Sequence, residues 1–372
     1  MTEAAQHDGT SRPLRGITVA EFGTGIAGAY CTKLFADCGA SVWRAPSELE
    51  ATNEAHWADA ALDPDAPETA GLYAAYLNAG KHSVRPDQAP PEADLVIIGE
   101  DHAGGNCPYT GRIATIALTW FGTDGPLRDV EGSELIVQAL AGLLHPVGPV
   151  EGPPMYPGPH HATTLAGTSA YVAGMAALLG HAGQSVALEV SVLEAVMALS
   201  EYQICLSESL GERVSRLGVN RFKPTCPLSI HACKEGWIGI TPITPAQWGA
   251  LCNMLDLPEL GASPELQMTR DRVAHVDRIE AAFDARFATR SADEWDVSAA
   301  STKCQWLWCL MRRRFWTIPY SMPGVLLQRS STAGSTTVSR KRHSGSRKHQ
   351  RGMIWTGRRH QGHGPHRLAG SL

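Results

Sequence analysis

The sequence predicts an α/β fold, with a parallel β-sheet covered by helices, followed by a second, smaller α+β unit. Residues 16–45 have the pattern strand, glycine-rich turn, helix and strand, and two apolar runs, 93–99 and 113–122, continue the alternation. Alternating strands and helices favour a parallel sheet because a crossover helix returns the chain to the same edge. The segment 227–243 instead predicts a hairpin with Lys-Glu-Gly in its turn.

Each expected element follows from its own pattern. The apolar, β-branched run GITVAEF (16–22) predicts the first strand, and the helical spacing of AYCTKLFADCG (29–39) predicts the helix behind it. The Pro- and acid-rich stretch 46–69 is typical of a surface loop. The remaining strand-like segments are ASVWRA (40–45), ADLVIIG (93–99) and IATIALTWFG (113–122), and the remaining helical ones are 134–144, 164–180, 189–210 and several between 245 and 295.

The charge of the chain changes abruptly near Asp296. All 37 Asp and Glu residues lie in 1–296, together with 18 Lys and Arg, which gives this body a net charge of −19. The 76 residues that follow carry 14 Lys and Arg and no acid. An acidic body argues against nucleic acid as a partner. We interpret the basic end as a solvated, disordered tail.

Other features narrow the class of protein. Nine Cys residues occur without CxxC pairs, so no zinc site or other metal site is predicted. The first 15 residues contain no apolar run, so we expect a cytoplasmic protein without a secretory leader. The uncharged stretch 152–188 has four prolines before Thr163 and many small residues after it. This composition favours a buried helix over a membrane span.

The segment Gly23–Gly28 (GTGIAG) satisfies the GxGxxG pattern between a predicted strand and a predicted helix. Glycines there allow a phosphate to approach the amides of a helix N-terminus, which predicts an NAD(P)-binding oxidoreductase. The next strand, however, ends in Arg44 and Ala45, without an acid to hold a ribose. A glycine-rich turn with no nucleotide is therefore the alternative interpretation.

The wider pattern resembles the family III CoA-transferases, which include carnitine-CoA enzymes and α-methylacyl-CoA racemases. The resemblance covers roughly residues 13–295 and rests on the order and spacing of five blocks. These blocks are PLRGITVAEFGTGIAGAYCTKLFADCGASVWR (13–44), YLNAGKHSV (76–84), FGTDGPLRDVEGSELIVQALAGLL (121–144), AGTSAYVAGMAALLGHAGQSVALEVSVLEAVMAL (166–199) and IHACKEGWIGITPITPAQWGALCNMLDLPEL (230–260).

The resemblance implies a Rossmann-like CoA-binding domain over 13–224, after a disordered N-terminus (1–12), and a small α+β domain over 225–295. It also implies a dimer of interlocked chains, with an acyl-CoA and a carboxylic acid as substrates and no tightly bound cofactor or metal. The residues that it places against CoA are Thr24, Ile26 and Ala27 in the first turn, and Arg44 and Lys81 near the phosphates.

The chain departs from the family at the nucleophile. The family uses an aspartate that forms an acyl anhydride and then a CoA thioester. Thr163 occupies that position here, and the neighbouring His160 and His161 are the other candidates for base or acyl carrier. No carboxylate lies between Glu151 and Glu189. The chain is therefore either a transferase with an unrecognised nucleophile or a non-catalytic subunit that pairs with a complete homologue.

Two other family segments differ as well. The His-Asp pair of the racemases is replaced by Ser133 and Glu134, and the family's Asn-Phe-Arg-Pro-Gly is replaced by residues 98–102, which contain two acids. Segment 305–321 lacks the expected Val-Pro and Asp-Pro features, but permissible codons read two bases later restore them. We interpret 296–372 as an out-of-frame tail, which would leave the interlocked dimer architecture incomplete.

Overall fold

The computed structural model describes most of the chain up to residue 301 and three short strands beyond it. The described residues are 12–23, 25–45, 71–84, 90–101, 107–211, 215–222, 225–301, 307–309, 327–332 and 335–340. The predicted disordered N-terminus (apart from residue 12), the predicted surface loop 46–69 and most of the segment 305–321 lie outside them.

Six parallel strands form the main sheet, in the order β3-β2-β1-β4-β5-β6. This order confirms the predicted parallel α/β fold. In such sheets, ligands bind outside the carboxyl ends of the strands where the strand order reverses, which here is between β1 and β4. The strands are β1 (Thr18–Phe22), β2 (Ser41–Arg44), β3 (His82–Ser83), β4 (Leu95–Ile98), β5 (Ala114–Thr119) and β6 (Val186–Ser191).

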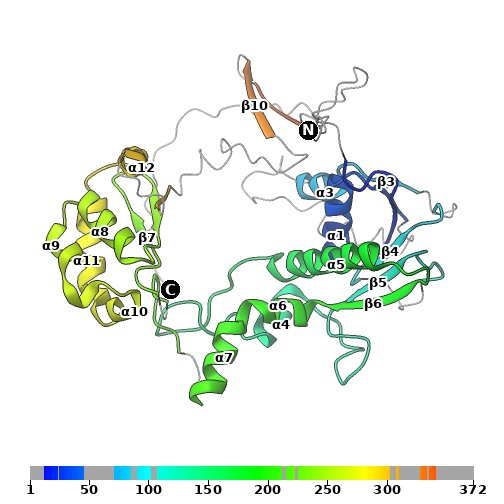
Figure 1. Cartoon of the computed structure of the whole chain (residues 1–372), viewed down its shortest axis with the longest axis horizontal. Coiled ribbons are helices and arrows are strands. Elements are labelled where there is room, and N and C mark those ends of the chain that lie inside the picture. The colour runs from blue at the N-terminus through cyan, green and yellow to red at the C-terminus, as the bar shows by residue number, and fades with distance from the viewer. Residues whose placement is uncertain are drawn as a thin grey trace, which may run out of the picture.

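Helices cover this sheet and complete the large core. In Figure 1 the long helix α5 runs alongside α1, and Gly167 brings them together, because a Cβ there would lie 2.5 Å from the Ala27 carbonyl oxygen. Burial of Val19, Phe35 and Ile116 in this core stabilises the sheet–helix layers. The helices are α1 (Ile26–Asp37), α3 (Leu72–Asn78), α4 (Glu134–Leu140), α5 (His161–Gly180), α6 (Val192–Met197) and α7 (Glu201–Leu210).

Helix α5 has the length and the apolar composition of a membrane-spanning helix. Among the described residues it is the one helix long and apolar enough to cross a bilayer. Core helices of soluble proteins pass the same test, and α5 packs on α1, β5 and β6. One third of this span is buried, and the choice of a buried helix over a membrane span stays a prediction.

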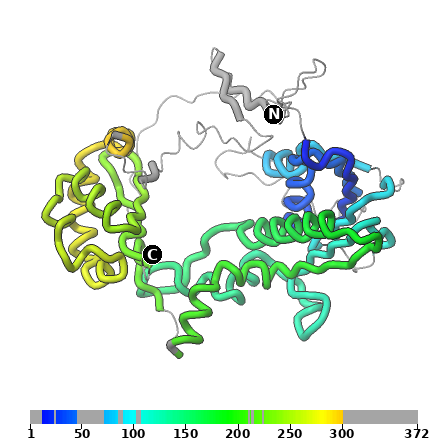
Figure 2. Tube along the Cα trace, viewed as in Figure 1, coloured from blue at the N-terminus to red at the C-terminus, as the bar shows by residue number. Residues whose placement is uncertain are grey.

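A second hydrophobic core lies among residues 226–299, at the other end of the molecule from the main sheet (Figures 1 and 2). We call the part of the chain that forms this core the small domain. The predicted hairpin is present as β7 and β8, and β9 joins it through antiparallel pairing with β8. A capping box between Thr244 and Gln247 begins α8. The elements are β7 (Ser229–Ala232), β8 (Trp237–Ile240), α8 (Pro245–Met254), α9 (Pro258–Ala262), α10 (Thr269–Arg272), α11 (Val276–Phe287), α12 (Ala292–Ser301) and β9 (Leu307–Cys309).

Two sequence expectations differ from the observed elements. The predicted helix over 189–210 begins only at Val192, because the preceding residues pair with β5 as β6 and Ser191 caps α6 by accepting from the Glu194 amide. The predicted boundary at 296 falls inside α12, and the tail beyond it contains β9 and an antiparallel pair. That pair is β10 (Leu327–Thr332) and β11 (Ser335–Arg340).

Candidate functional site

The first turn and the end of β4 meet at the point where the strand order reverses. A Cβ on Gly25 would lie 2.3 Å from the Glu100 carboxyl, and one on Gly28 would lie 2.9 Å from the Gly99 Cα. Gly23 has a φ of +95°, which side chains rarely adopt. The glycines of GTGIAG are therefore required by the close approach of the segment after β4.

Glu100 places its carboxylate on the N-terminus of α1. Its Oε1 accepts the Ala27 amide at 2.8 Å, and its Oε2 accepts the Gly28 amide at 3.1 Å. Burial, and then the charge of Asp101, raise the pKa of Glu100 to about 7. This acid occupies the helix end at which the sequence predicted a ligand, beside Ile26 and Ala27. Thr24, the third predicted contact in the turn, lies outside the described residues.

The two predicted phosphate-binding cations, Arg44 and Lys81, share one buried carboxylate, Glu21. Lys81 Nζ lies 2.8 Å from Glu21 Oε2, and Arg44 Nε lies 3.2 Å from Glu21 Oε1. Burial alone raises the pKa of Glu21, but the two cations outweigh it and hold the pKa below its usual value. Lys81 Nζ also donates to the Ala29 carbonyl of α1 at 2.8 Å. Lys81 thus joins the first strand to α1, and Arg44 joins the first strand to β2.

The contact distances indicate the charge states of Glu21, Arg44 and Lys81. Burial lowers the pKa of Lys81 more than Glu21 raises it, whereas the pKa of Glu21 shifts in the direction of an ion pair. The contact of 2.8 Å and the presence of two cations beside one carboxylate favour the ion pair. A role of Arg44 and Lys81 toward CoA stays a prediction.

Thr163, at the predicted nucleophile position, lies in the first turn of α5 and is almost fully buried. Its hydroxyl donates to Glu134 Oε2 at 3.1 Å, and its amide donates to the same oxygen at 3.1 Å. Glu134 Oε1 accepts the Ala162 amide at 2.6 Å and Gln138 Nε2 at 2.7 Å. The fold therefore brings a carboxylate to Thr163 from α4, although the sequence near Thr163 contains none.

The two predicted histidines differ in their surroundings. The His160 ring stacks on Tyr73 of α3, with 4.9 Å between ring centroids, whereas His161 is exposed at the first position of α5. Burial lowers the pKa of His160, although Glu134 acts in the opposite direction. The neutral form of His160 is thus favoured near neutral pH. The ring stacks on Tyr73 within range of the Glu134 charge.

Tyr73 connects the two helix ends. Burial is the main cause that raises the pKa of its phenol, and the charges of Glu134 and Glu100 both add to the shift. Its hydroxyl is hydrogen-bonded to Thr164. The starts of α1 and α5, each capped by a glutamate, therefore face one shared region around Tyr73.

Sequence reasoning did not single out Tyr73, Gln138 or the role of Glu134. The available signal for Glu134 was Ser133, a helix-capping residue whose Oγ accepts the Ile136 amide at the start of α4. This capping places Glu134 in the first turn of α4, but only the tertiary fold places α4 against the start of α5. Among the described residues, no group of three or more His, Cys, Asp or Glu side chains could hold a metal ion.

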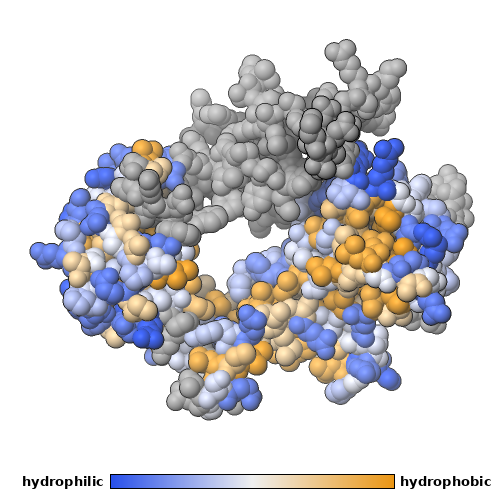
Figure 3. Space-filling model, viewed as in Figure 1, coloured by the Kyte–Doolittle hydropathy of each residue, from blue (hydrophilic) through white to orange (hydrophobic). Residues whose placement is uncertain are grey.

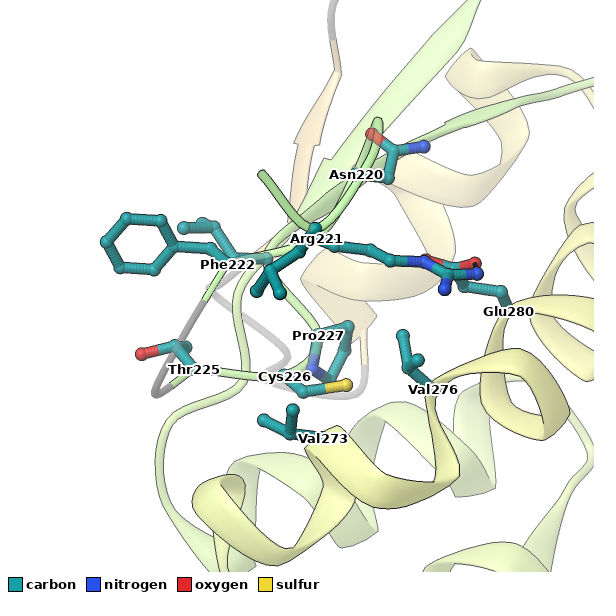
Figure 4. A pocket seen from close by; sticks show the side chains of 11 residues that line it. Asn220, Arg221, Phe222, Thr225, Cys226, Pro227, Val273, Val276 and Glu280 are labelled. Carbon is teal, nitrogen blue, oxygen red and sulfur yellow. Dashed lines mark hydrogen bonds and ion pairs between the residues drawn. The ribbon is translucent and has the colours of Figure 1, made fainter. Parts of the chain in front are cut away.

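A separate cavity of about 190 Å³ lies in the small domain (Figure 4). Its wall is mostly apolar and includes Val273, Val276 and Cys226, and burial raises the pKa of the Cys226 thiol to about 11. In Figure 4 the Arg221 side chain points toward Glu280, 3.1 Å away, and Arg221 also pairs with Asp277. Since Arg221 is already neutralised by two acids, this cavity is a poor match for an anionic substrate.

Comparison with known proteins identifies what the chain resembles. The sequence pattern described as CoA-transferase family III matches residues 110–312. An acyl-CoA transferase of Fusarium pseudograminearum is 25% identical over 311 residues, covering 76% of this chain and 67% of its own length. The succinyl-CoA:glutarate CoA-transferase of Mus musculus is 22% identical over 306 residues, covering 76% of this chain and 69% of its own length.

Solved structures show the same fold. A CAIB/BAIF family protein from Brucella suis superimposes with a TM-score of 0.63 at 21% identity, covering 81% of this chain and 84% of its own. A protein of Mycobacterium tuberculosis gives a TM-score of 0.61 at 20% identity, covering 83% and 87%. These likenesses confirm the mixed α/β architecture with a parallel sheet.

Proposed function

The chain belongs to CoA-transferase family III, and from this premise we propose that it transfers CoA between an acyl-CoA and a carboxylic acid. The observation that carries the proposal is the Glu134 carboxylate at the start of α5, hydrogen-bonded to Thr163 at the family's nucleophile position. CoA transfer between acids needs an enzyme carboxylate that can accept first the acyl group and then CoA. Glu134 is a carboxylate at that place in the fold.

The proposed substrates are a CoA thioester and a small organic acid. CoA would bind in the region between the starts of α1 and α5, in contact with Ile26 and Ala27. Arg44 and Lys81 would hold the first strand and its turn in position through Glu21. Neither substrate requires a resident metal or cofactor.

Membership of this family makes an NAD(P)-binding oxidoreductase the weaker interpretation of the first turn. Its glycines are accounted for by the approach of Gly99 and Glu100. In addition, Glu100 already accepts the two amides that a dinucleotide phosphate would use.

The second candidate is a non-catalytic subunit that pairs with a complete homologue, or with a second copy of this chain. Thr163 in place of the nucleophilic aspartate favours it. One relative, from Chloroflexus aurantiacus, is the beta subunit of a succinyl-CoA–L-malate CoA-transferase. Figure 3 shows apolar surface spread over the large domain, and a subunit contact would cover such surface. Exposed apolar side chains there include Leu135, Ile136 and Leu140 of α4 and Val172 and Leu179 of α5.

The two candidates are separated by one assay. The purified full chain is loaded on immobilised CoA, and then incubated with acetyl-CoA and a free carboxylic acid, alone and with an added homologue. Retention on CoA with turnover by the chain alone supports the transferase. Turnover that requires the homologue supports the subunit, and absence of retention together with tight NADPH binding would contradict both.

A further inference from the structure

The start of α5 holds one carboxylate in a fixed position. Glu134 receives hydrogen bonds from Ala162 and Thr163 at the start of α5 and from Gln138 on its own helix, at 2.6 to 3.1 Å. Gln138 is completely buried, and its Nε2 also donates to the Gly158 carbonyl at 3.1 Å. In the described part of the chain, Gln138 Oε1 has no hydrogen-bond partner. The carboxylate is therefore oriented by donors from two helices.

We infer that Glu134 is the nucleophile of this chain, taking the part that an aspartate plays at the position of Thr163 in the family; the inference rests on the proposed CoA transfer. A carboxylate oxygen can attack a thioester carbonyl without the help of a base. A threonine hydroxyl must first lose a proton. Thr163 donates its proton toward Glu134 and thereby positions the carboxylate.

The chemistry of CoA transfer selects the carboxylate over its neighbours. An acyl ester on Thr163 would release CoA as a free thiol, and the acceptor acid could not then become a thioester. An acyl-imidazole on His160 or His161 would carry the acyl group but could not carry CoA. Only a carboxyl group forms both a mixed anhydride with the acyl group and a thioester with CoA, so the energy of the thioester bond is retained.

The steps balance without an oxidant or a net proton. A Glu134 carboxylate oxygen attacks the thioester carbonyl, the C–S bond breaks, and CoA leaves as the thiolate, which gives a mixed anhydride. The thiolate attacks the Glu134 carbonyl carbon, and the first acid leaves as its carboxylate. The acceptor carboxylate then attacks the Glu134 thioester and expels the thiolate again. The thiolate attacks the acceptor's acyl carbon, which forms the new acyl-CoA and regenerates Glu134.

The hydrogen bonds assist the steps in which Glu134 is expelled. In the last step the Glu134 carboxylate is the leaving group, and negative charge returns to its oxygens. Two amides at the N-terminus of α5, one hydroxyl and one side-chain amide stabilise that charge. Such preorganised donors are worth about 10²–10³ in rate each when aimed at developing charge.

Trapping the covalent adduct tests the assignment. The full chain is incubated with acetyl-CoA, quenched with hydroxylamine, and digested, and the peptide that carries the hydroxamate is identified by mass spectrometry. We expect the modification on Glu134 in the wild-type chain and in the matched control Glu131→Gln, an exposed acid three residues earlier. Glu134→Gln should lose the modification and at least about 1,000-fold in transfer rate.

Thr163→Val should slow transfer by about 100-fold, the lower end of the range for one such donor, with the modification still on Glu134. Modification of a different carboxylate, or a Glu134→Gln variant that keeps its rate, would overturn the assignment while leaving the proposed transfer intact. Modification of Thr163, His160 or His161 in place of a carboxylate would overturn both. A chain that binds CoA but neither transfers it nor forms any adduct would overturn both. The wild-type mapping does not depend on the folding of a variant, and thermal melting checks each variant.

Discussion

Thr163 Oγ1 lies 3.1 Å from Glu134 Oε2, so the residue at the family's nucleophile position is hydrogen-bonded to a carboxylate from another helix. A carboxylate therefore lies at the start of α5, although a threonine occupies the family's nucleophile position. Glutamate is longer than aspartate by one methylene group, and α4 packs against α5. Together these allow a side chain that is remote in sequence to lie at the start of α5.

The buried group around Glu21 gives a prediction about stability. Glu21→Gln leaves Lys81 and Arg44 buried beside a neutral amide, and we expect the free energy of unfolding to fall by about 3–5 kcal/mol. Urea denaturation measures this change. The control is Arg112→Gln, which removes an exposed partner of Asp94 and should cost much less than the loss of Glu21. Equal losses in the two variants would contradict the account.

Glu100 predicts a dependence of stability on pH. Its pKa is raised from an ordinary 4.5 to about 7, so folding favours the protonated acid. Stability should therefore be greatest below the unfolded pKa, fall as the pH rises between the two values, and stay level above the folded one. We expect the urea midpoint to drop between about pH 4.5 and about pH 7, and to drop less in Glu100→Gln. Glu131→Gln is the control. If the urea midpoint of Glu100→Gln falls with pH as steeply as that of the wild type and of this control, Glu100 is excluded as the cause.

The contact between α1 and α5 depends on one glycine. Gly167→Ala places a methyl group 2.5 Å from the Ala27 carbonyl oxygen, so the helices must separate, and we expect a loss of about 1–3 kcal/mol. Gly180→Ala is the matched control, because it lies in the same helix and its Cβ would meet nothing within 4 Å. That change should be neutral or slightly stabilising. Thermal melting distinguishes the two, and an unaffected Gly167→Ala variant would show that the helices are not in close contact.

Arg272 is the polar centre of the small domain. It is fully buried, donates to four carbonyl oxygens at 2.7 to 3.0 Å, and stacks over Trp248 at 4.4 Å. Arg272→Met leaves those carbonyls unpaired, and we expect a loss of about 3 kcal/mol or more. Arg270→Met, at an exposed site in the same helix, should change stability by less than about 0.5 kcal/mol. Chemical denaturation monitored by tryptophan fluorescence reports both.

Much of the fold was predictable because its elements have strong local patterns. The strand, glycine turn and helix of 16–39 have apolar periodicity and a phosphate-binding type of turn, and the hairpin around 234–236 has a turn sequence. The strand β6 was missed because VALEV precedes a helix without a break, and its pairing with β5 is a long-range contact. Periodicity within a segment does not report such pairing.

The site was less predictable than the fold for the same reason. Arg44 and Lys81 were recognised as cations near the first turn, but their shared partner Glu21 lies on another strand. Glu134 was noted only as a departure from a racemase motif. Its place beside Thr163 depends on how α4 packs against α5, which no short motif in the sequence contains. The out-of-frame origin of the tail stays a prediction, and the nucleotide sequence across 290–330 tests it.

The transfer reaction itself tests the central claim most directly. The full chain and its Glu134→Gln variant are mixed with acetyl-CoA and a free carboxylic acid, and the CoA thioesters are followed by chromatography. The account predicts that the wild-type chain converts the acid into its CoA thioester without accumulation of free CoA, and that the variant does not. Free CoA accumulating with no new thioester, or equal transfer by the variant, would contradict it.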